Sequence, residues 1–568
     1  MAWSALGALL IVGAAFLFHE MRHTTLWFDE WQWALERRGN DLRTFLAPHN
    51  GHFSLVPVAL YKLLFATAGL DDFTAYRAMG IGAHLLCVAL VFAYARPRVG
   101  GLVALLAAVL ILTLGPGWQN ILWPFQVGSL ISIAAGIGAL LMLDRADRRG
   151  DAAACGLVAL SLASSGLGIV VAIGVAVDVL WGRRDLRAAW IIAGPAGLYA
   201  LWWLGYQDSG GITRHNLVLT PGFVADAAAG ALSAVTGLAV TPVSENGTAV
   251  NDSATLGWGR PLAVGTAALL AWRFTGPARV SPRTLTLLAM LLSYWTLTGL
   301  QRAQVGPPDS SRYLYVGAVF IVLIAVELAR GVAPSRRALP IVALGVVVAS
   351  IANLGDLREG ARYLRAQAAA TRADLGALEL SRPLLRPDSV AWGFPGTPII
   401  TVRAGPYFAA ARELGTPAAN AAAIATAPEP ARLTADAELA RAHRVSLRPT
   451  AAGLPAGSPP AVDAAAGGTV TPANGCLEFR PADTEATGAT REVQFTLPPD
   501  GVLLTAEGGS ASVSVRRFAA GFPPEPAQRL AGGASATLRI EPDGAAQPWH
   551  VRVSPEGRVT ACGLAEIP

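Results

Sequence analysis

Long apolar runs dominate the first 355 residues, and only short polar connections separate them. A run of about 20 such residues is long enough to cross the ~30 Å hydrocarbon core of a bilayer as a helix. The composition agrees, because 53% of the residues are hydrophobic and only 15% are charged. We therefore expect a polytopic α-helical membrane protein.

The apolar runs predict about eleven membrane-spanning helices, with ends that are loose by a few residues. The first run lacks a basic flank and a small-residue cleavage site, so it is interpreted as a retained span and not as a signal peptide. The expected spans are 3–19, 76–95, 101–115, 127–143, 152–165, 167–181, 188–205, 259–274, 284–300, 313–329 and 337–353.

Arginine positions indicate which runs cross. The run 53–69 contains Pro57 and Lys62, the only lysine of the chain. If this run stays outside and the N-terminus is cytoplasmic, every compact arginine cluster lies inside, and if it crosses, every cluster lies outside. We therefore interpret 53–69 as an outer interfacial or re-entrant helix. The clusters are 96–98, 144–149, 182–187, 273–283 and 330–337.

This topology exports a C-terminal region of mixed composition. A helix is expected over 356–380, a strand over 398–404 and a helix over 406–415, while 449–468 has the composition of a linker. From about residue 475, seven short alternating runs between Gly/Pro turns predict a β-sandwich. The expected parts are a transmembrane domain over 1–355, a mixed region over 356–468 and a sandwich over 469–568.

Two cysteines fall in the first and last of these strands. In an oxidising compartment Cys476 and Cys562 can form a disulfide that closes the sandwich, and two free thiols are the alternative.

An acidic pair follows the first span in "TTLWFDEWQW" (24–33). Adjacent residues of a helix project about 100° apart, so one of Asp29 and Glu30 can face a cavity while the other orients it. Trp33 lies one turn beyond Asp29, where a sugar ring could stack. An interfacial aromatic belt with solvated charges is the alternative interpretation.

His49 and His52 follow in "APHNGHFSLVP" (47–57) and can orient a substrate or Asp29. With Asp29 they could also bind a metal ion, but no further ligand is evident, so we assign no metal site. A requirement for a divalent cation stays open.

A second charged outer segment is "QRAQVGPPDSSRY" (301–313). Arg312, with Arg302 and Tyr313, is placed to bind a phosphate at the level of the lipid headgroups, and interface anchoring is the alternative. The chain lacks the clusters of basic and aromatic residues that mark nucleic-acid binding.

Together these features resemble membrane glycosyltransferases of the GT-C type, such as protein O-mannosyltransferases, the aminoarabinose transferase of lipid A and mycobacterial arabinofuranosyltransferases. The resemblance covers about 1–355 and rests on "FDEW", "SRY", the partly embedded helix and the roughly eleven spans. The exported β-sandwich is similar to the carbohydrate-binding tails of the arabinosyltransferases.

The resemblance implies an inverting enzyme of the bacterial inner membrane, with a cytoplasmic N-terminus and an exported C-terminal region. Its donor would be a polyprenyl-phosphate-linked sugar, and its acceptor an exported glycan, lipid or protein of the cell envelope. Asp29 would be the general base. The other candidates would bind or orient: Arg312, Arg302 and Tyr313 the donor phosphate, and Glu30, His49, His52 and Trp33 the acceptor or the base.

Three alternatives stay open. A ligase or polymerase of lipid-linked oligosaccharides would share the fold and the donor class. A transporter or flippase of lipid-linked sugars usually has internal repeats and charges at mid-membrane, whereas here no clear repeat is seen and the charges cluster near the outer edge. A scaffold that binds wall polysaccharide would hardly need eleven spans.

Overall fold

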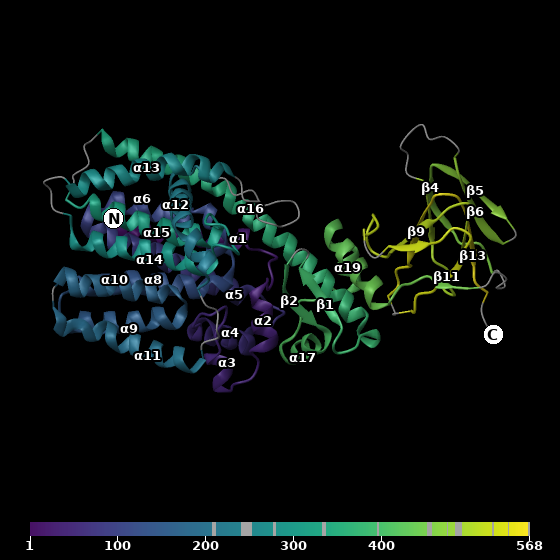
Figure 1. Cartoon of the computed structure of the whole chain (residues 1–568), viewed down its shortest axis with the longest axis horizontal. Helices are drawn as coiled ribbons and strands as arrows, with labels where there is room; N and C mark the ends of the chain where they lie inside the picture. The colour runs from purple at the N-terminus through teal and green to yellow at the C-terminus, as the bar shows by residue number, and fades with distance from the viewer. Residues whose placement is uncertain are drawn as a thin grey trace. The chain divides into compact units, whose positions relative to one another are not determined.

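The computed structural model divides the chain into two compact units, Met1–Arg365 and Ala366–Pro568 (Figure 1). The residues that the structure describes are 1–183, 185–206, 212–239, 253–275, 280–331, 337–394, 397–450, 457–473, 475–482, 491–524, 527–542 and 545–565.

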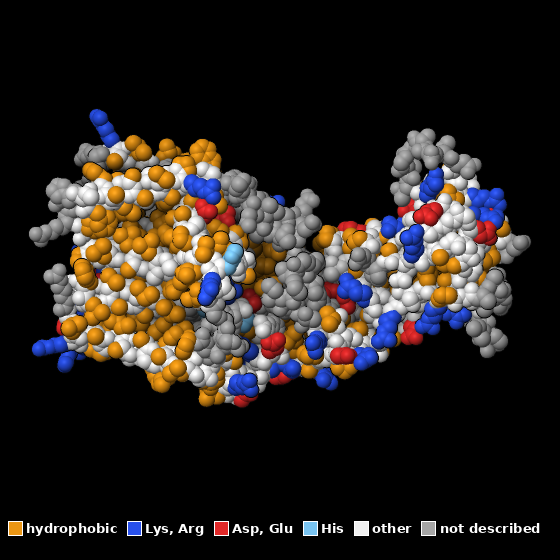
Figure 2. Space-filling model, viewed as in Figure 1, with side chains coloured by type: hydrophobic (Ala, Val, Ile, Leu, Met, Phe, Trp, Pro, Cys, Tyr) orange, Lys and Arg blue, Asp and Glu red, His pale blue; other side chains and the backbone are white. Residues whose placement is uncertain are grey.

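The first unit is helical, and its long helices run side by side (Figure 1). Each expected span coincides with one of them, which confirms the predicted polytopic helical architecture. Hydrophobic side chains cover much of the visible surface of these helices, as a lipid-facing bundle requires (Figure 2). The helices are α1 (Ala2–Glu20), α5 (Thr74–Val99), α6 (Gly101–Leu112), α8 (Val127–Leu143), α9 (Arg148–Ser164), α10 (Leu167–Val177), α11 (Trp190–Tyr206), α13 (Ser253–Thr275), α14 (Pro282–Arg302), α15 (Ser311–Leu328) and α16 (Ala338–Leu380).

The number of spans stays a prediction. Among the described residues, seven helices are long and apolar enough to cross a membrane, or eight if the bent pair formed by α6 and the segment Gly115–Leu122 is one span. The other expected spans are helices that are shorter or less apolar.

One of these seven helices, α12 (Arg214–Thr236), lies between the expected spans 188–205 and 259–274, in a segment where no span is predicted. The side-chain oxygen of Asn216 accepts a hydrogen bond from the backbone N–H of Gln304 (3.2 Å). Gly230 packs against Asp309. Asn216 and Gly230 are about 21 Å apart along the helix, yet both contact the single connection between α14 and α15. Helix α12 therefore runs across the end of the bundle and not along it.

The arginine-rich connections lie together at one end of the bundle. Arg98 forms ion pairs with Asp144 (2.7 Å) and with Glu327, which also accepts a hydrogen bond from the Tyr94 hydroxyl (2.7 Å). Arg283 joins the same group through Asp144 (2.8 Å). The Glu327 side chain is fully buried, so its charge depends on these partners.

Short helices lie between the long ones in sequence and form the other end of the bundle. Helix α4 has 14 residues, about 21 Å, and is too short to cross, in line with the interpretation of 53–69. Lys62 on α4 donates hydrogen bonds to the carbonyl oxygen of Arg37 (2.6 Å) and to the hydroxyl of Thr44 (2.8 Å). These hydrogen bonds of Lys62 hold α4 against the segment that precedes it. The short helices at this end are α2 (Asp29–Glu36), α3 (Leu42–Leu46), α4 (Leu55–Ala68), η1 (Gly115–Gly117), α7 (Trp118–Leu122) and η2 (Pro124–Gln126). Two others, η3 (Asp178–Arg183) and η4 (Leu186–Ala189), belong to the arginine-rich end, where Asp178 pairs with Arg283 (3.3 Å).

The second unit begins with the end of α16 and a group of small elements. The helices expected over 356–380 and 406–415 and the strand expected over 398–404 are present as α16, α17 and β2. The small elements are η5 (Arg382–Leu384), β1 (Val390–Phe394), β2 (Thr397–Arg403), α17 (Ala404–Leu414), α18 (Ala421–Ala425) and α19 (Glu429–Ala442).

All seven strands expected after residue 475 are present and contribute to two sheets. The five-stranded sheet has the order β10-β9-β12-β7-β4, and the six-stranded sheet has the order β3-β11-β8-β13-β6-β5. Buried side chains of both sheets, such as Phe479 and Phe495, belong to one core. The predicted β-sandwich is therefore confirmed. The strands are β3 (Arg448–Pro449), β4 (Val462–Ala466), β5 (Gly468–Ala473), β6 (Cys476–Pro481), β7 (Glu492–Thr496), β8 (Val502–Glu507), β9 (Ala511–Arg516), β10 (Gln528–Leu530), β11 (Ser535–Leu538), β12 (His550–Pro555) and β13 (Arg558–Gly563).

Cys476 and Cys562 are directly paired on β6 and β13 and form a disulfide. The stretch 449–468 is not only a linker, since it contains β4, an edge strand that pairs with β7. All five residues of β4 are exposed, so this segment has no buried face. Its pairing with the backbone of β7 makes it a strand.

Replacing Glu327 by alanine is expected to lower the free energy of unfolding by about 3–5 kcal/mol, because Arg98 loses a buried carboxylate partner. Arg145→Ala is the matched control. Its ion pair with Asp147 is about half exposed, and its loss should cost about 0–1 kcal/mol. Thermal unfolding of the detergent-solubilised variants checks the prediction, and equal effects of the two substitutions would contradict it.

Candidate functional site

Helix α2 begins at the acidic pair, and the residue before it has a strained backbone. Phe28 has φ 51° and ψ −116°, a conformation that costs free energy for any residue with a Cβ. Among the described non-glycine residues, His23, Phe28 and Asn50 are three of the five with positive φ. Such strain persists only where the surrounding structure imposes it, so this part of the chain is held in a fixed shape.

Residues 49–52, His-Asn-Gly-His, form a tight two-residue turn. The backbones of His49 and His52 exchange two hydrogen bonds of 3.0 and 2.9 Å. Asn50 and Gly51 both have positive φ, 51° and 78°, as a type I′ turn requires. The turn places the two histidines directly opposite each other, with their side chains on the same face.

Asp29, His49 and Trp33 are in contact one after another. The Asp29 carboxylate lies 3.4 Å from Nε2 of His49, and both side chains are only 6% exposed. The Trp33 indole N–H donates to Nδ1 of His49 (3.1 Å). Because an indole nitrogen can only donate, Nδ1 accepts and the proton of the neutral ring is on Nε2, toward Asp29. This tautomer leaves no free lone pair on His49 for a metal ion.

The Asn50 side-chain amide also lies 3.2 Å from Nε2 of His49. The atom at this distance is the amide nitrogen Nδ2, so a proton on Nε2 requires the amide to be turned over, with its oxygen toward the ring. Within the described part of the chain, no group of three or more His, Cys, Asp or Glu side chains is placed to hold a metal ion.

Trp33 is buried against Tyr61 and Phe125, with ring centroids 5.0 and 4.7 Å away. Its ring therefore supports His49 and is not presented to a sugar.

Glu30 is fully buried and joins three segments. Its carboxylate accepts hydrogen bonds from the Tyr61 hydroxyl on α4, the Trp123 indole N–H (3.2 Å) and the Trp27 backbone N–H (2.7 Å). Burial raises the pKa of Glu30 to about 8, against the three donors, which favour the ionised form. Glu30 thus fixes the start of α2, and with it the neighbouring Asp29.

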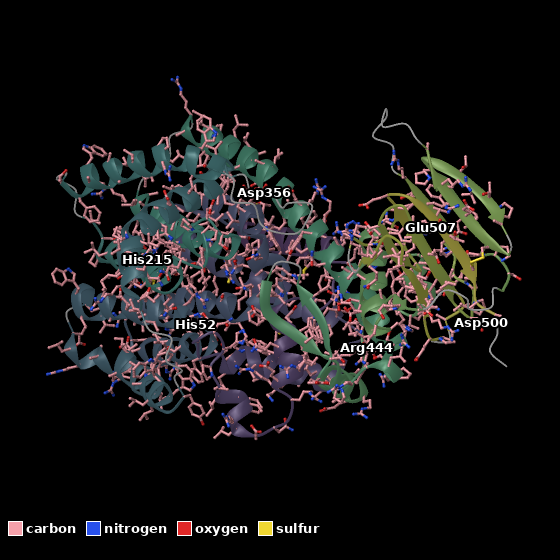
Figure 3. The ribbon with its side chains drawn as sticks, turned by 45° about the vertical axis from the view of Figure 1, so that its right-hand side comes forward. His52, His215, Asp356, Arg444, Asp500 and Glu507 are labelled. Atoms are coloured by element: carbon pink, nitrogen blue, oxygen red, sulfur yellow. A yellow bond between two sulfur atoms is a disulfide. The ribbon has the colours of Figure 1, made fainter. Side chains whose placement is uncertain are left out.

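The two charged segments, 220 residues or more apart in sequence, meet at this turn. An N–H of the Arg302 guanidinium donates to the backbone oxygen of Asn50 (3.4 Å) across a separation of 252 residues. His52, labelled in Figure 3, lies near both arginines. Burial, with smaller contributions from Arg302, His49 and Arg312, lowers its pKa to about 4, so the His52 ring is neutral at pH 7.

Arg312 carries unused hydrogen-bonding capacity. Its Nε is buried, and no described residue accepts a hydrogen bond from it. The guanidinium carbon lies 5.4 Å from the centroid of the Tyr313 ring, which restricts the side chain. A buried donor without an acceptor costs free energy, so an oxygen-rich ligand at this place would be favoured.

An apolar groove of about 470 Å³ begins one residue beyond His52. Phe53 stacks on Trp202 with a centroid distance of 4.6 Å, and Leu198 and Leu201 on its rim are 67% and 69% exposed. The groove therefore opens toward the apolar surface of the bundle. It is lined by Leu46, Phe53, Leu55, Ala159, Leu162, Ala163, Pro195, Leu198, Tyr199, Leu201, Trp202 and Tyr206.

Two features of the site were not anticipated from the sequence. The turn at 50–51 has a clear signal, because Asn-Gly is the strongest dipeptide indication of a tight turn. The partners of Glu30 have no signal in the local sequence. Tyr61 and Trp123 are 31 and 93 residues away from Glu30, and only the tertiary fold brings them together.

No family model and no curated protein matches this chain. Among solved structures, it is similar to ArnT from Cupriavidus metallidurans bound to undecaprenyl phosphate, at 12% identity over 73% of this chain and 85% of that chain (TM-score 0.41). The arabinosyltransferase EmbB from Mycobacterium smegmatis matches at 11% identity over 98% and 64% of the two chains (TM-score 0.39). The archaeal oligosaccharyltransferase AglB from Archaeoglobus fulgidus matches at 15% over 73% and 64% (TM-score 0.40).

At such TM-scores these likenesses carry no information about the reaction, which must be inferred from this chain's own residues.

The pKa of Glu30 predicts a pH-dependent stability. Because its pKa is raised from 4.5 to about 8 on folding, the folded state binds the extra proton, and the free energy of unfolding falls as pH rises through this window. In Glu30→Gln the side-chain oxygen can accept from Trp27 and Trp123 while the amide donates to the Tyr61 hydroxyl. We expect this variant to lose that part of the pH dependence, an effect on the order of a few kcal/mol.

Thermal unfolding across this pH window checks the prediction. Glu36→Gln, an exposed position of the same helix, is the control and should follow the wild type. Parallel pH profiles for Glu30→Gln and the wild type would show that Glu30 is not the group responsible.

Proposed function

We propose that this protein is an inverting glycosyltransferase that moves a sugar from a polyprenyl-phosphate-linked donor to an acceptor of the cell envelope. One observation carries the proposal: a carboxylate oriented by a histidine lies at the same site as two arginines and an apolar groove. An interfacial belt of aromatic and charged residues would need neither a buried carboxylate in contact with a histidine nor a buried arginine donor that no described residue satisfies.

Arg302 and Arg312 are proposed to bind the donor phosphate. A guanidinium matches the geometry of phosphate oxygens, and the unused Nε of Arg312 would gain an acceptor. Tyr313 would hold that guanidinium in place. The neighbouring groove would take the first isoprene units of the lipid, because it is apolar and opens toward the bilayer.

Asp29 is proposed as the general base. One of its oxygens faces His49, and within the described residues the other accepts no hydrogen bond. It would take the proton of the acceptor hydroxyl as that oxygen attacks the anomeric carbon from the face opposite the phosphate. The bond between the anomeric carbon and the phosphate oxygen then breaks, and its electron pair leaves with the lipid phosphate. A single displacement of this kind inverts the anomeric configuration.

The charge that develops on the leaving phosphate would be stabilised by Arg302 and Arg312. His52, kept neutral between them, adds no further positive charge and can offer a hydrogen bond. Glu30, His49 and Trp33 are positioning residues in this scheme, because they act through Asp29 and need not touch the substrate.

We further propose that the site faces the outside of a bacterial plasma membrane and that the N-terminus is cytoplasmic. The gathering of the arginine-rich connections at the opposite end of the bundle supports this orientation. The C-terminal unit would then be exported, to a compartment in which the disulfide between Cys476 and Cys562 persists.

Asp29→Asn is expected to reduce kcat by about 10²–10⁴-fold while leaving donor binding unchanged, because an amide of the same shape cannot take the acceptor proton. A transfer assay with purified protein and polyprenyl-phosphate-linked sugars measures the first quantity, and a binding assay with the same donors measures the second.

Glu36→Gln is the matched control, because it also removes a carboxylate from α2 but at an exposed position, and it should keep wild-type activity. Transfer by Asp29→Asn at the wild-type rate would refute the assignment of the base.

A further inference from the structure

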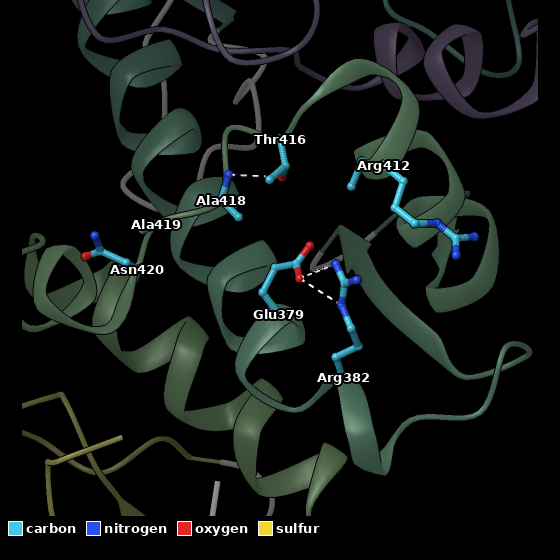
Figure 4. Close-up of a pocket in the computed structure, with 8 residues that line it drawn as sticks. Glu379, Arg382, Arg412, Thr416, Ala418, Ala419 and Asn420 are labelled. Carbon is cyan, nitrogen blue, oxygen red and sulfur yellow. Dashed lines mark hydrogen bonds and ion pairs between the residues drawn. The ribbon is translucent and has the colours of Figure 1, made fainter. Parts of the chain in front are cut away.

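The C-terminal unit contains an open pocket of about 320 Å³ that the proposed reaction does not use (Figure 4). It lies between the end of α16, η5, α17 and the residues that follow α17. Its polar lining consists of Glu379, Arg382, Arg412, Thr416 and Asn420, and alanines form the rest. Its volume is at the lower end of the range of small-ligand sites.

Arg382 is held in place before any ligand binds. Its Nε donates to the Glu379 carboxylate (3.0 Å), as the dashed lines in Figure 4 show, and its guanidinium carbon lies 4.4 Å from the centroid of the Phe408 ring. A cation held from two sides loses little entropy when it binds an anion.

The hydrogen-bond acceptors of two lining residues are already in use. The Thr416 hydroxyl accepts from the Ala418 N–H (3.2 Å) and is 2.6 Å from the Tyr407 hydroxyl. The side-chain oxygen of Asn420 accepts from the Ala423 N–H (2.9 Å), so the amide N–H groups remain available.

Arg412 supplies the largest unused capacity. It is exposed, and its guanidinium has no hydrogen bond or ion pair with any described residue. The free donors around the pocket are the Arg412 guanidinium and the Asn420 amide, and Oε1 of Glu379 is a buried acceptor that no described residue satisfies. The two guanidinium groups outnumber the single carboxylate, so the lining carries a net positive charge. Such a site favours a ligand with acceptor oxygens and a negative charge.

We propose that this pocket is a second binding site, which takes an anionic ligand of the size of one sugar residue that carries a carboxylate or a phosphate. The inference does not depend on the proposed transferase activity, because the pocket and its residues belong to the other unit. Acidic sugars and phosphorylated groups share the required chemistry, and the test distinguishes them.

Isothermal titration calorimetry of the full-length protein in nanodiscs of neutral lipid tests the proposal. The measurements use an Arg302→Gln/Arg312→Gln background, so that the first anion site does not contribute. D-Glucuronate and inorganic phosphate are the anionic probes, and D-glucose is the neutral control. We expect saturable binding of at least one anion and none of glucose. The anion that binds more tightly shows which charged group the site prefers, the carboxylate of a uronic acid or a phosphoryl group.

Arg412→Gln is expected to weaken anion binding about tenfold, as the loss of one charge-assisted hydrogen bond predicts. Arg386→Gln is the matched control, because Arg386 is 70% exposed and pairs with Asp388 away from the pocket. An unchanged thermal transition shows that each variant is folded. Absence of anion binding, equal binding of glucose, or wild-type affinity in folded Arg412→Gln would overturn the proposal.

Discussion

A charged side chain next to lipid is costly unless it is paired or hydrogen-bonded, and this constraint organises the first unit. At one end of the bundle, Arg98 and Arg283 share carboxylates with the ends of neighbouring helices, which fixes those ends relative to one another. At the other end, the carboxylates of Asp29 and Glu30 are buried as well, but they are held by aromatic donors and a histidine. The first arrangement satisfies its charges completely, whereas the second leaves hydrogen-bonding capacity unused.

Hydrogen-bonding groups that remain unused distinguish a binding site from a purely structural network. The side chain of Glu30 accepts hydrogen bonds from Tyr61, Trp123 and Trp27. Because it is also buried, it fixes the position of the start of α2. Asp29, one residue earlier, has a single partner, and Arg312 has a buried nitrogen with none among the described residues. The strained backbone at Phe28 and the tight turn at Asn50 and Gly51 fix the positions of Asp29 and His49. Rigid support beside unsatisfied charged groups is what general-base chemistry on a charged donor requires.

Apolar runs predict the helices because hydrophobicity and length dominate in a bilayer, whereas the outer placement of 53–69 stays a prediction from the arginine positions. The alternating runs likewise predict seven strands, and the disulfide follows from the register of the first and last of them. The path of α12 was not predictable, since it is apolar like a span and only its contacts with the α14–α15 connection show that it lies across the bundle. The link between Arg302 and Asn50, and the hydrogen bonds of Glu30, depend on how the helices pack, for which local sequence has no signal.

The central claim is that Arg302, Arg312 and the groove beside His52 form one site for a lipid-linked phosphate. A structure of the protein with a bound polyprenyl phosphate tests it most directly. We expect phosphate oxygens within hydrogen-bond distance of Nε of Arg312 and of the Arg302 guanidinium, with the first isoprene units against Phe53 and Trp202. A phosphate bound elsewhere, with Arg312 still without a partner, would contradict it.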